Sequence, residues 1–145
     1  MKAPRLIRAA ATQVTPNAPS TYQFTIHVPK NAGEPLKAVT ITQKTSPERI
    51  KFDASNSKAF MGDSFAGGPA ISLANIGGSQ PSDDNSVTIV FDKPVEPGNT
   101  VTVSLRAFHN PQFGGIYQFG VTAYPIGEKS EGLYLGSARL HFLQE

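Results

Sequence analysis

The sequence predicts an all-β protein, an antiparallel two-sheet β-sandwich of immunoglobulin-like type with about eight or nine strands. Three observations lead to this prediction: short segments in which apolar and polar residues alternate, turn-forming residues between them, and no long window with a helical period. The 145 residues include 13 Gly and 12 Pro, and 17% are charged. Because a chain of this length fits one domain, we expect a single β-sandwich over residues 1–145.

The clearest strands are segments whose apolar residues would face the core while their polar neighbours face solvent. The five segments of this kind are 22–28, 39–42, 87–91, 101–106 and 117–123. Less regular strands are expected at 5–14, 49–53 and 71–76. The best short helical candidate is a turn near 56–61, and it is too short to change the predicted fold class.

The final strand, 133–143, changes its parity along its length. Leu133 and Leu135 fall on one face, whereas Leu140 and Phe142 fall on the other. One extra residue would reconcile the two halves, and Gly136 is where a β-bulge costs least. We therefore predict a bulge at Gly136.

The connections between the strands carry turn-forming residues. Pro97-Gly98 suits a type II turn, because proline presets φ and glycine accepts the positive φ that follows. This turn is predicted to join strands 87–92 and 100–107 as a hairpin. A second turn is expected at 31–35, and 77–85 reads as a long polar loop.

Composition and charge exclude several classes of protein. The net charge is only +2 and basic residues never occur three in a row, so nucleic-acid binding is disfavoured. No apolar run approaches the roughly 20 residues of a membrane-spanning helix, so we expect no membrane insertion. The N-terminal MKAPRLIRAAATQV has no continuous apolar region typical of an export signal. Either the chain is intracellular, or Met1 is an added start on a mature exported domain.

Catalytic motifs are weak in this sequence. The segment Gly62-Asp63-Ser64-Phe65-Ala66 fails the last position of a nucleophile elbow, and no helical pattern follows it. Asp83-Asp84-Asn85 resembles a polar loop more than a calcium site. No catalytic residue, cofactor or resident metal is expected, and the chain is predicted not to be an enzyme.

Three histidines are candidate metal ligands, because imidazole binds zinc and copper. The strand pattern places His27 and His141 away from the core, and His109 follows strand 100–107 in a loop. None is paired at i+2 or i+4 with another ligand. Solvated surface histidines are therefore favoured over a metal site.

The segment FHNPQFGGIYQFGVTAYPIG, residues 108–127, is unusually rich in aromatic residues and glycine. The strand pattern assigns Tyr117 and Phe119 to the core, and Asn-Pro with Gly-Gly would shape a hairpin before them. Phe108 and Phe113 remain unexplained by a strand: folded back they would cap one end of the sandwich, and left outward they would form a binding surface. Capping is favoured, because soluble proteins seldom leave such side chains open.

Contact with an external ligand is thus predicted to involve few side chains of this segment. The candidate ligand-binding residues are Phe108, His109, Phe113 and Tyr124.

The chain resembles a known family through several spaced motifs. NPQFGGIYQFGVTAYP at 110–125 and LGSARLHF at 135–142 look like the C-terminal signature of the cyanobacterial family called domain of unknown function 2808. The segments 4–6, 22–26, 29–36, 39–43, 59–60 and 91–98 fit the same pattern in order. The resemblance implies an exported cyanobacterial protein whose signal peptide precedes the Pro-Arg-Leu segment. It supplies no catalytic residues, and the loop at 62–86 fits none of its motifs.

Two functions follow from these features. The leading hypothesis is an exported, non-enzymatic module with a binding or structural role in the periplasm, at the cell surface or in the extracellular matrix, whose partner is an envelope or extracellular protein or polysaccharide. The alternative is a small periplasmic metal-binding protein that uses His27, His109 and His141, with Met61 or Asp63 as further ligands.

Overall fold

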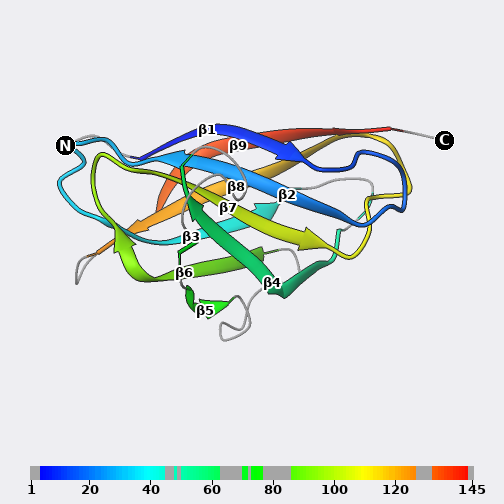
Figure 1. The fold of residues 1–145 in the computed structure, drawn as a ribbon. Helices are drawn as coiled ribbons and strands as arrows, with labels where there is room; N and C mark the ends of the chain where they lie inside the picture. Colours follow the sequence, from blue (N-terminus) through cyan, green and yellow to red (C-terminus); the bar gives the residue numbers. More distant parts are fainter. Residues whose placement is uncertain are drawn as a thin grey trace.

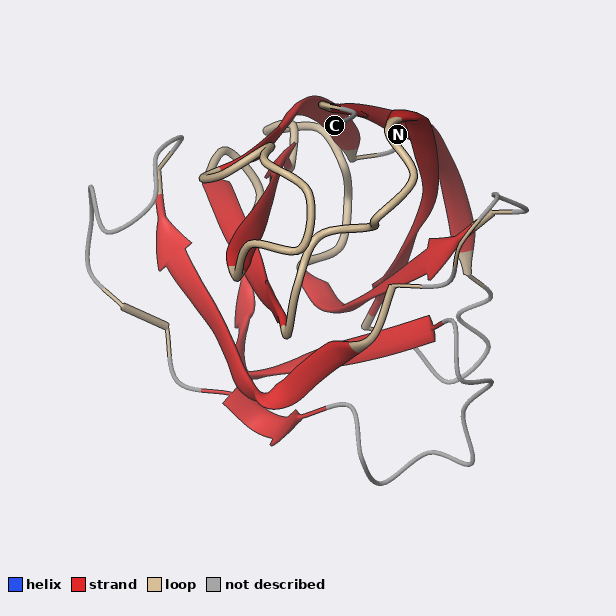
Figure 2. Cartoon of the chain, turned by 90° about the vertical axis from the view of Figure 1, so that its right-hand side faces the viewer, coloured by secondary structure: helices blue, strands red, loops and turns tan. Residues whose placement is uncertain are grey.

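The computed structural model describes residues 4–44, 48, 50–62, 70–71, 73–76, 86–126 and 132–143. These residues contain nine strands and no helix (Figures 1 and 2). The strands are β1 (Arg5–Ala11), β2 (Ser20–His27), β3 (Leu36–Gln43), β4 (Phe52–Met61), β5 (Leu73–Ile76), β6 (Ser86–Val95), β7 (Thr100–Ala107), β8 (Gly115–Pro125) and β9 (Leu133–Phe142).

The strands form two sheets that pack face to face. The four-stranded sheet has the order β1-β2-β7-β4, and the five-stranded sheet has the order β5-β6-β3-β8-β9, with every neighbouring pair antiparallel. β1 and β9 run side by side where the two sheets meet (Figure 1), and the Leu143 N–H donates to the Val14 carbonyl at 2.9 Å. The predicted all-β, antiparallel two-sheet sandwich is confirmed.

The core lies between the sheets and is built by the alternation seen in the sequence. Tyr22, Phe24 and Ile26 of β2 are fully buried, and they face Tyr117 and Phe119 of β8 across the sandwich in the same buried cluster. Several of these rings meet edge to face, as Tyr22 and Phe119 do with centroids 5.8 Å apart. Such edge contacts add to the burial of apolar area and hold the sheets in one relative position.

Segment 56–61, predicted to be a turn, belongs instead to strand β4, and the strand predicted at 49–53 begins at Phe52. β4 pairs with β7, but the register shifts between Asp53 and Lys58. This irregularity breaks the alternation on which the sequence prediction depends. A polar segment with an uneven pattern was therefore read as a turn.

Two connections were predicted correctly as turns but wrongly as hairpins. Gly98 has φ +93°, and the Asn99 N–H donates to the Glu96 carbonyl at 3.3 Å, as the type II turn requires. However, this turn leads from β6 in the five-stranded sheet to β7 in the four-stranded sheet. Residues 108–114 likewise lead from β7 to β8 in the other sheet. Turn residues show where a chain reverses, but not which sheet receives the next strand.

The predicted bulge at Gly136 is confirmed. The register between β8 and β9 shifts between Val121 and Thr122, and Gly136 has φ +118°. This shift brings Leu135 into contact with the core while Leu140 stays buried, although Leu133 at the strand end remains 40% exposed. The bulge also decides which β9 side chains face outward. The predicted polar loop at 77–85, with Asp83 to Asn85, lies outside the described residues.

Candidate binding surfaces

The connection between β7 and β8 is fixed to the fold by a buried asparagine. Asn110 has no exposed surface, and its Oδ1 accepts a hydrogen bond from the Tyr22 hydroxyl at 2.8 Å. Its Nδ2 donates to the carbonyls of Gln13 and Thr15, each at 2.9 Å. Its backbone N–H donates to the Ala18 carbonyl at 2.7 Å. Asn110 therefore joins the β7–β8 connection to β2 and to the β1–β2 connection.

Two further groups hold the same segment in place. One oxygen of the Glu48 carboxylate accepts the backbone N–H groups of Gln112 and Phe113, at 2.7 and 3.2 Å. The Tyr117 hydroxyl donates to the Phe113 carbonyl at 2.6 Å. Burial raises the pKa of Tyr22 far above its ordinary value, with Tyr117 and Glu48 adding smaller effects. The Tyr22 hydroxyl accordingly keeps its proton and remains a donor to Asn110.

Phe108 and Phe113 point to solvent, so the predicted cap is wrong. The two side chains are 54% and 55% exposed, and His109 is exposed as well. The buried positions of this segment are taken by Asn110 and Pro111 instead. Because the backbone is held from several sides, the aromatic rings cannot turn inward without breaking these bonds. We call residues 108–113 the aromatic loop.

Tyr124 does not join the other three predicted ligand-binding residues. It lies near the far end of β8, nine positions after Gly115, which corresponds to about 30 Å along an extended strand. Its ring packs beside Gly132, where an added Cβ would come within 2.8 Å of Tyr124 Cε1. The structure thus brings Phe108, His109 and Phe113 onto one loop and leaves Tyr124 on a sheet face.

The histidines are spread over the molecule. His27 lies opposite Thr100, with its Nδ1 2.9 Å from Thr100 Oγ1, whereas His109 follows the other end of β7, a strand about 23 Å long. His141 lies on β9 beside Ile116. Within the described ranges no three His, Asp or Glu side chains gather as a metal site would require. Of the two further ligands proposed, Asp63 lies outside those ranges, and Met61 at the end of β4 lines the pocket described next.

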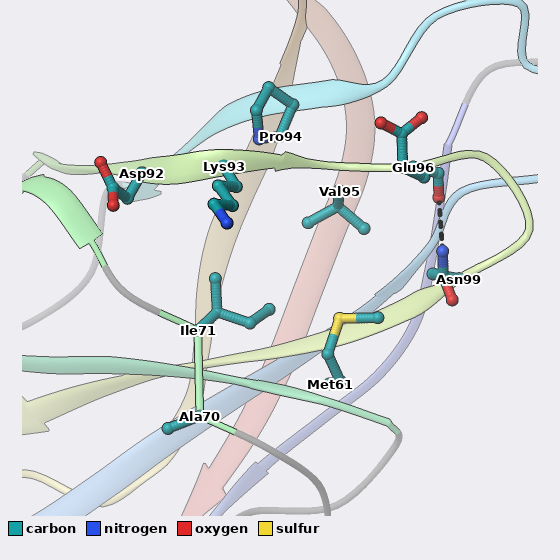
Figure 3. A pocket seen from close by; sticks show the side chains of 9 residues that line it. All are labelled: Met61, Ala70, Ile71, Asp92, Lys93, Pro94, Val95, Glu96 and Asn99. Atoms are coloured by element: carbon teal, nitrogen blue, oxygen red, sulfur yellow. Dashed lines mark hydrogen bonds between the residues drawn. The ribbon is translucent and has the colours of Figure 1, made fainter.

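A pocket of about 360 Å³ lies between the end of β4, residues 70–71 and the end of β6. Figure 3 shows Met61, Ile71, Lys93 and Val95 pointing toward one another into this pocket. The carboxylate of Glu96 points away from it. Lys93 points inward, and Asp92 also lines this pocket.

The outer surface of the five-stranded sheet was missed by the sequence prediction. Its most prominent side chain is Tyr134 of β9, which is 57% exposed and whose hydroxyl lies 2.8 Å from Ser137 Oγ. Alternation counted back from Leu140 places Tyr134 inward, and only the bulge at Gly136 turns it outward. The bulge was predicted from the sequence. Its consequence, that Tyr134 faces outward, is the signal that could have identified this surface.

The fold defines an immunoglobulin-like β-sandwich, with an exposed aromatic loop at one end. The chain belongs to the family described as "Protein of unknown function (DUF2808)", whose model matches residues 1–142. The resemblance found in the sequence is therefore confirmed for the family. A search of curated proteins finds no match. Among the described residues, no helix is long and apolar enough to cross a membrane.

Solved structures share this fold at low sequence identity. The collagen-binding subdomain of the Enterococcus faecalis surface protein ACE is 8% identical, with a TM-score of 0.57 over 97% of this chain and 99% of that one. The bacterial hydrophobin BslA is 13% identical, with a TM-score of 0.53 over 99% and 100%. The C-terminal domain of the Streptococcus agalactiae polypeptide BspA is 11% identical, with a TM-score of 0.50 over 97% of this chain and 49% of that one. At these identities the similarity concerns the fold.

Proposed function

We propose that this chain is an exported, non-enzymatic binding module that contacts a partner at the cell envelope or in the extracellular matrix through its aromatic loop. The observation that carries this proposal is the exposure of Phe108 and Phe113 on a backbone anchored by the buried Asn110. Large aromatic side chains held outward on a fixed backbone lose little conformational entropy when they bind. They are also the residues that most often dominate the binding energy of protein surfaces.

The comparisons support a binding role without identifying the partner. Proteins that share the fold include the collagen-binding subdomain of a bacterial surface protein and a bacterial hydrophobin. The partner we propose is an envelope or extracellular protein or polysaccharide.

Export and a cyanobacterial origin are part of this proposal and rest on the family resemblance. The native protein is expected to begin close to Pro4, after removal of a signal peptide, and to be found in the periplasmic or medium fraction. Mass spectrometry of the native N-terminus in cytoplasmic, periplasmic and medium fractions tests this expectation. An unprocessed N-terminus found only in the cytoplasm would exclude the proposed compartment.

The aromatic loop can be tested with a double substitution, Phe108→Ala and Phe113→Ala. We expect backbone amide shifts of residues 108–113 when the labelled protein is titrated with envelope or matrix fractions, and loss of these shifts in the double variant. Each substitution alone should change the free energy of unfolding by about 1 kcal/mol or less, because each ring is half exposed. A large loss of stability would restore the cap interpretation.

The matched control is Ile7→Ala, which removes a 49% exposed apolar side chain from β1, away from the loop. This variant should bind like the unaltered protein. Fractions treated with protease or with periodate distinguish a protein partner from a polysaccharide. If no fraction shifts the loop, or if the double variant binds as well as the control, the proposed contact is wrong.

A further inference from the structure

Hydroxyl groups form two rows across the outer surface of the five-stranded sheet. The strand register places each row perpendicular to β6, β3, β8 and β9, with one residue from each strand. The first row is Thr88, Thr40, Thr122 and Tyr134, and the second is Ser86, Thr42, Gly120 and Ser137. We call this surface the hydroxyl face. Thr40 Oγ1 lies 2.9 Å from Thr88 Oγ1, and Thr42 Oγ1 lies 2.9 Å from Ser86 Oγ, so neighbouring side chains orient one another.

Tyr134 lies across the glycine of the second row. A Cβ placed on Gly120 would come within 3.1 Å of Tyr134 Cε1 and 3.5 Å of its hydroxyl oxygen. The absence of a side chain at Gly120 is therefore what lets the ring approach the sheet. Because Tyr134 remains 57% exposed, much of its ring is open to solvent. The result is an aromatic surface set among hydroxyl groups.

A basic row borders the hydroxyl rows. The Lys44 N–H donates to the Gln118 carbonyl at 2.8 Å, and Gln118 is paired with Arg139 of β9. Lys44 Nζ lies 4.9 Å from the centre of the Tyr134 ring. A hydrogen bond from Lys44 is the main reason that the pKa of Tyr134 is lowered, followed by a hydrogen bond with Ser137.

The charge of this surface is mainly positive. β3, β8 and β9 contain no aspartate or glutamate, whereas β3 contains Lys37 and β9 contains Arg139 and His141. β6 adds one exposed carboxylate, Asp92, four positions after Thr88. Lys44 follows β3 directly. A partner centred on β8 and β9 would thus meet hydroxyl groups, an amide, an aromatic ring and cations, while Asp92 lies on β6 at the other side of the face.

We propose that the hydroxyl face binds an acidic polysaccharide, a chain of sugar rings that carry carboxylate groups. A sugar ring stacks on the exposed part of Tyr134, as apolar C–H groups do on aromatic rings. Lys44 and Arg139 pair with carboxylates of neighbouring sugar units. The threonine hydroxyls and Gln118 exchange hydrogen bonds with sugar hydroxyls. This inference rests on the proposed binding function, but it names a second surface and a partner class.

A polysaccharide fits this surface better than an anionic membrane does. Binding in a membrane interface requires apolar side chains that enter the boundary of the acyl chains. The hydroxyl rows offer none, and the large exposed aliphatic side chain on the outer side of β8 is Ile116, at the end of the strand. Rows of hydroxyl groups at strand spacing instead match a partner that is itself rich in hydroxyl groups.

The probe for this proposal is purified oligogalacturonate, with its uncharged methyl ester as the matched ligand. We expect oligogalacturonate to shift the amide signals of Gln118, Gly120 and Tyr134, with affinity that falls as salt is added. The methyl ester should bind about tenfold more weakly, because it cannot pair with the cations.

Three variants test the assigned residues. Tyr134→Ala and the double variant Lys44→Gln/Arg139→Gln should each bind about tenfold more weakly, whereas Tyr134→Phe keeps the ring and should bind like the unaltered protein. The control Lys30→Gln/Lys58→Gln removes the same two charges elsewhere, since Lys30 lies between β2 and β3 and Lys58 lies on β4. It should bind within about twofold of the unaltered protein.

Several results would overturn the proposal. Equal losses in the test and control charge variants would mean unspecific attraction, and binding only to phosphatidylglycerol vesicles would mean that a membrane is the partner. Loss of oligogalacturonate binding in the Phe108→Ala/Phe113→Ala variant would move the site to the aromatic loop. If oligogalacturonate fails while envelope fractions still shift residues 108–113, this inference fails and the proposed function stands. If oligogalacturonate binds the hydroxyl face but no fraction shifts the loop, the proposed loop contact fails instead.

Discussion

Replacement of Asn110 by alanine is expected to lower the free energy of unfolding by about 2 to 4 kcal/mol. The substitution removes the acceptor of the Tyr22 hydroxyl and the donor to the carbonyls of Gln13 and Thr15. The buried Tyr22 hydroxyl left without its acceptor costs about 1 to 3 kcal/mol. The carbonyls of Gln13 and Thr15 keep the Ser20 hydroxyl and the Ala18 N–H as donors, so each lost bond from Asn110 adds about 0.5 to 1 kcal/mol. Urea unfolding followed by circular dichroism measures the change.

A substitution of Tyr22, the residue that donates to Asn110, provides a milder control. Tyr22→Phe removes a single hydroxyl and leaves only Asn110 Oδ1 without its donor, so we expect a loss of about 1 to 2 kcal/mol. In the Asn110→Ala variant the amide signals of the aromatic loop should also broaden or move, because its anchor to β2 is gone. If Asn110→Ala were no more destabilising than Tyr22→Phe, Asn110 would not be the anchor described above.

Replacement of Phe119 by alanine is the second large effect that we expect, about 3 to 5 kcal/mol. Phe119 of β8 is fully buried, and its ring centre lies 5.8 Å from that of Tyr22, 5.9 Å from that of Phe24 and 6.2 Å from that of Phe52. All three partners belong to the other sheet. The substitution therefore leaves a cavity at the interface of the sheets and removes three edge contacts.

The same chemical change at an exposed position provides the control. Phe113→Ala also replaces phenylalanine by alanine, but its side chain is 55% exposed, and its loss should be about 1 kcal/mol or less. If Phe119→Ala fails to fold, Phe119→Leu should be measurable, with a loss of about 1 to 2 kcal/mol. Similar losses of unfolding free energy for Phe119→Ala and Phe113→Ala would show that Phe119 is not more deeply buried than Phe113 in solution.

The core could be predicted from the sequence because side-chain alternation is a local property of a strand. Tyr117, Phe119 and Val121 were assigned to the interior from their spacing alone, and all three are buried. The pairing of strands is not local: Pro97-Gly98 forms the predicted turn, yet the strands on either side enter different sheets. Sequence patterns that extend over a few residues carry no information about that choice.

The aromatic loop shows the same limit for the candidate site. Asn110-Pro111 was read as a turn, which is a property of the dipeptide, but the role of Asn110 depends on Tyr22, 88 residues earlier. Asn110 and Pro111 fill the buried positions of this segment, so Phe108 and Phe113 are not needed to close the end of the sandwich. The predicted cap was therefore wrong because the burial of Asn110 depends on a residue distant in the sequence, Tyr22, and not on its neighbours. The outward position of Tyr134, by contrast, follows from the bulge predicted at Gly136 and was within reach of the sequence.

The crossing of the chain between the sheets also has a consequence for how the protein folds. β2 and β4 are joined only through β7, and β3 and β9 only through β8, so neither sheet can close until the last third of the chain is present. Pairing strands that are distant in sequence costs loop-closure entropy before the strand contacts contribute any stability. Folding is therefore expected to be slow compared with proteins built from local contacts. A growing chain would remain open until synthesis is nearly finished. Such a chain stays unfolded long enough to pass through a secretion channel that admits only unfolded chains.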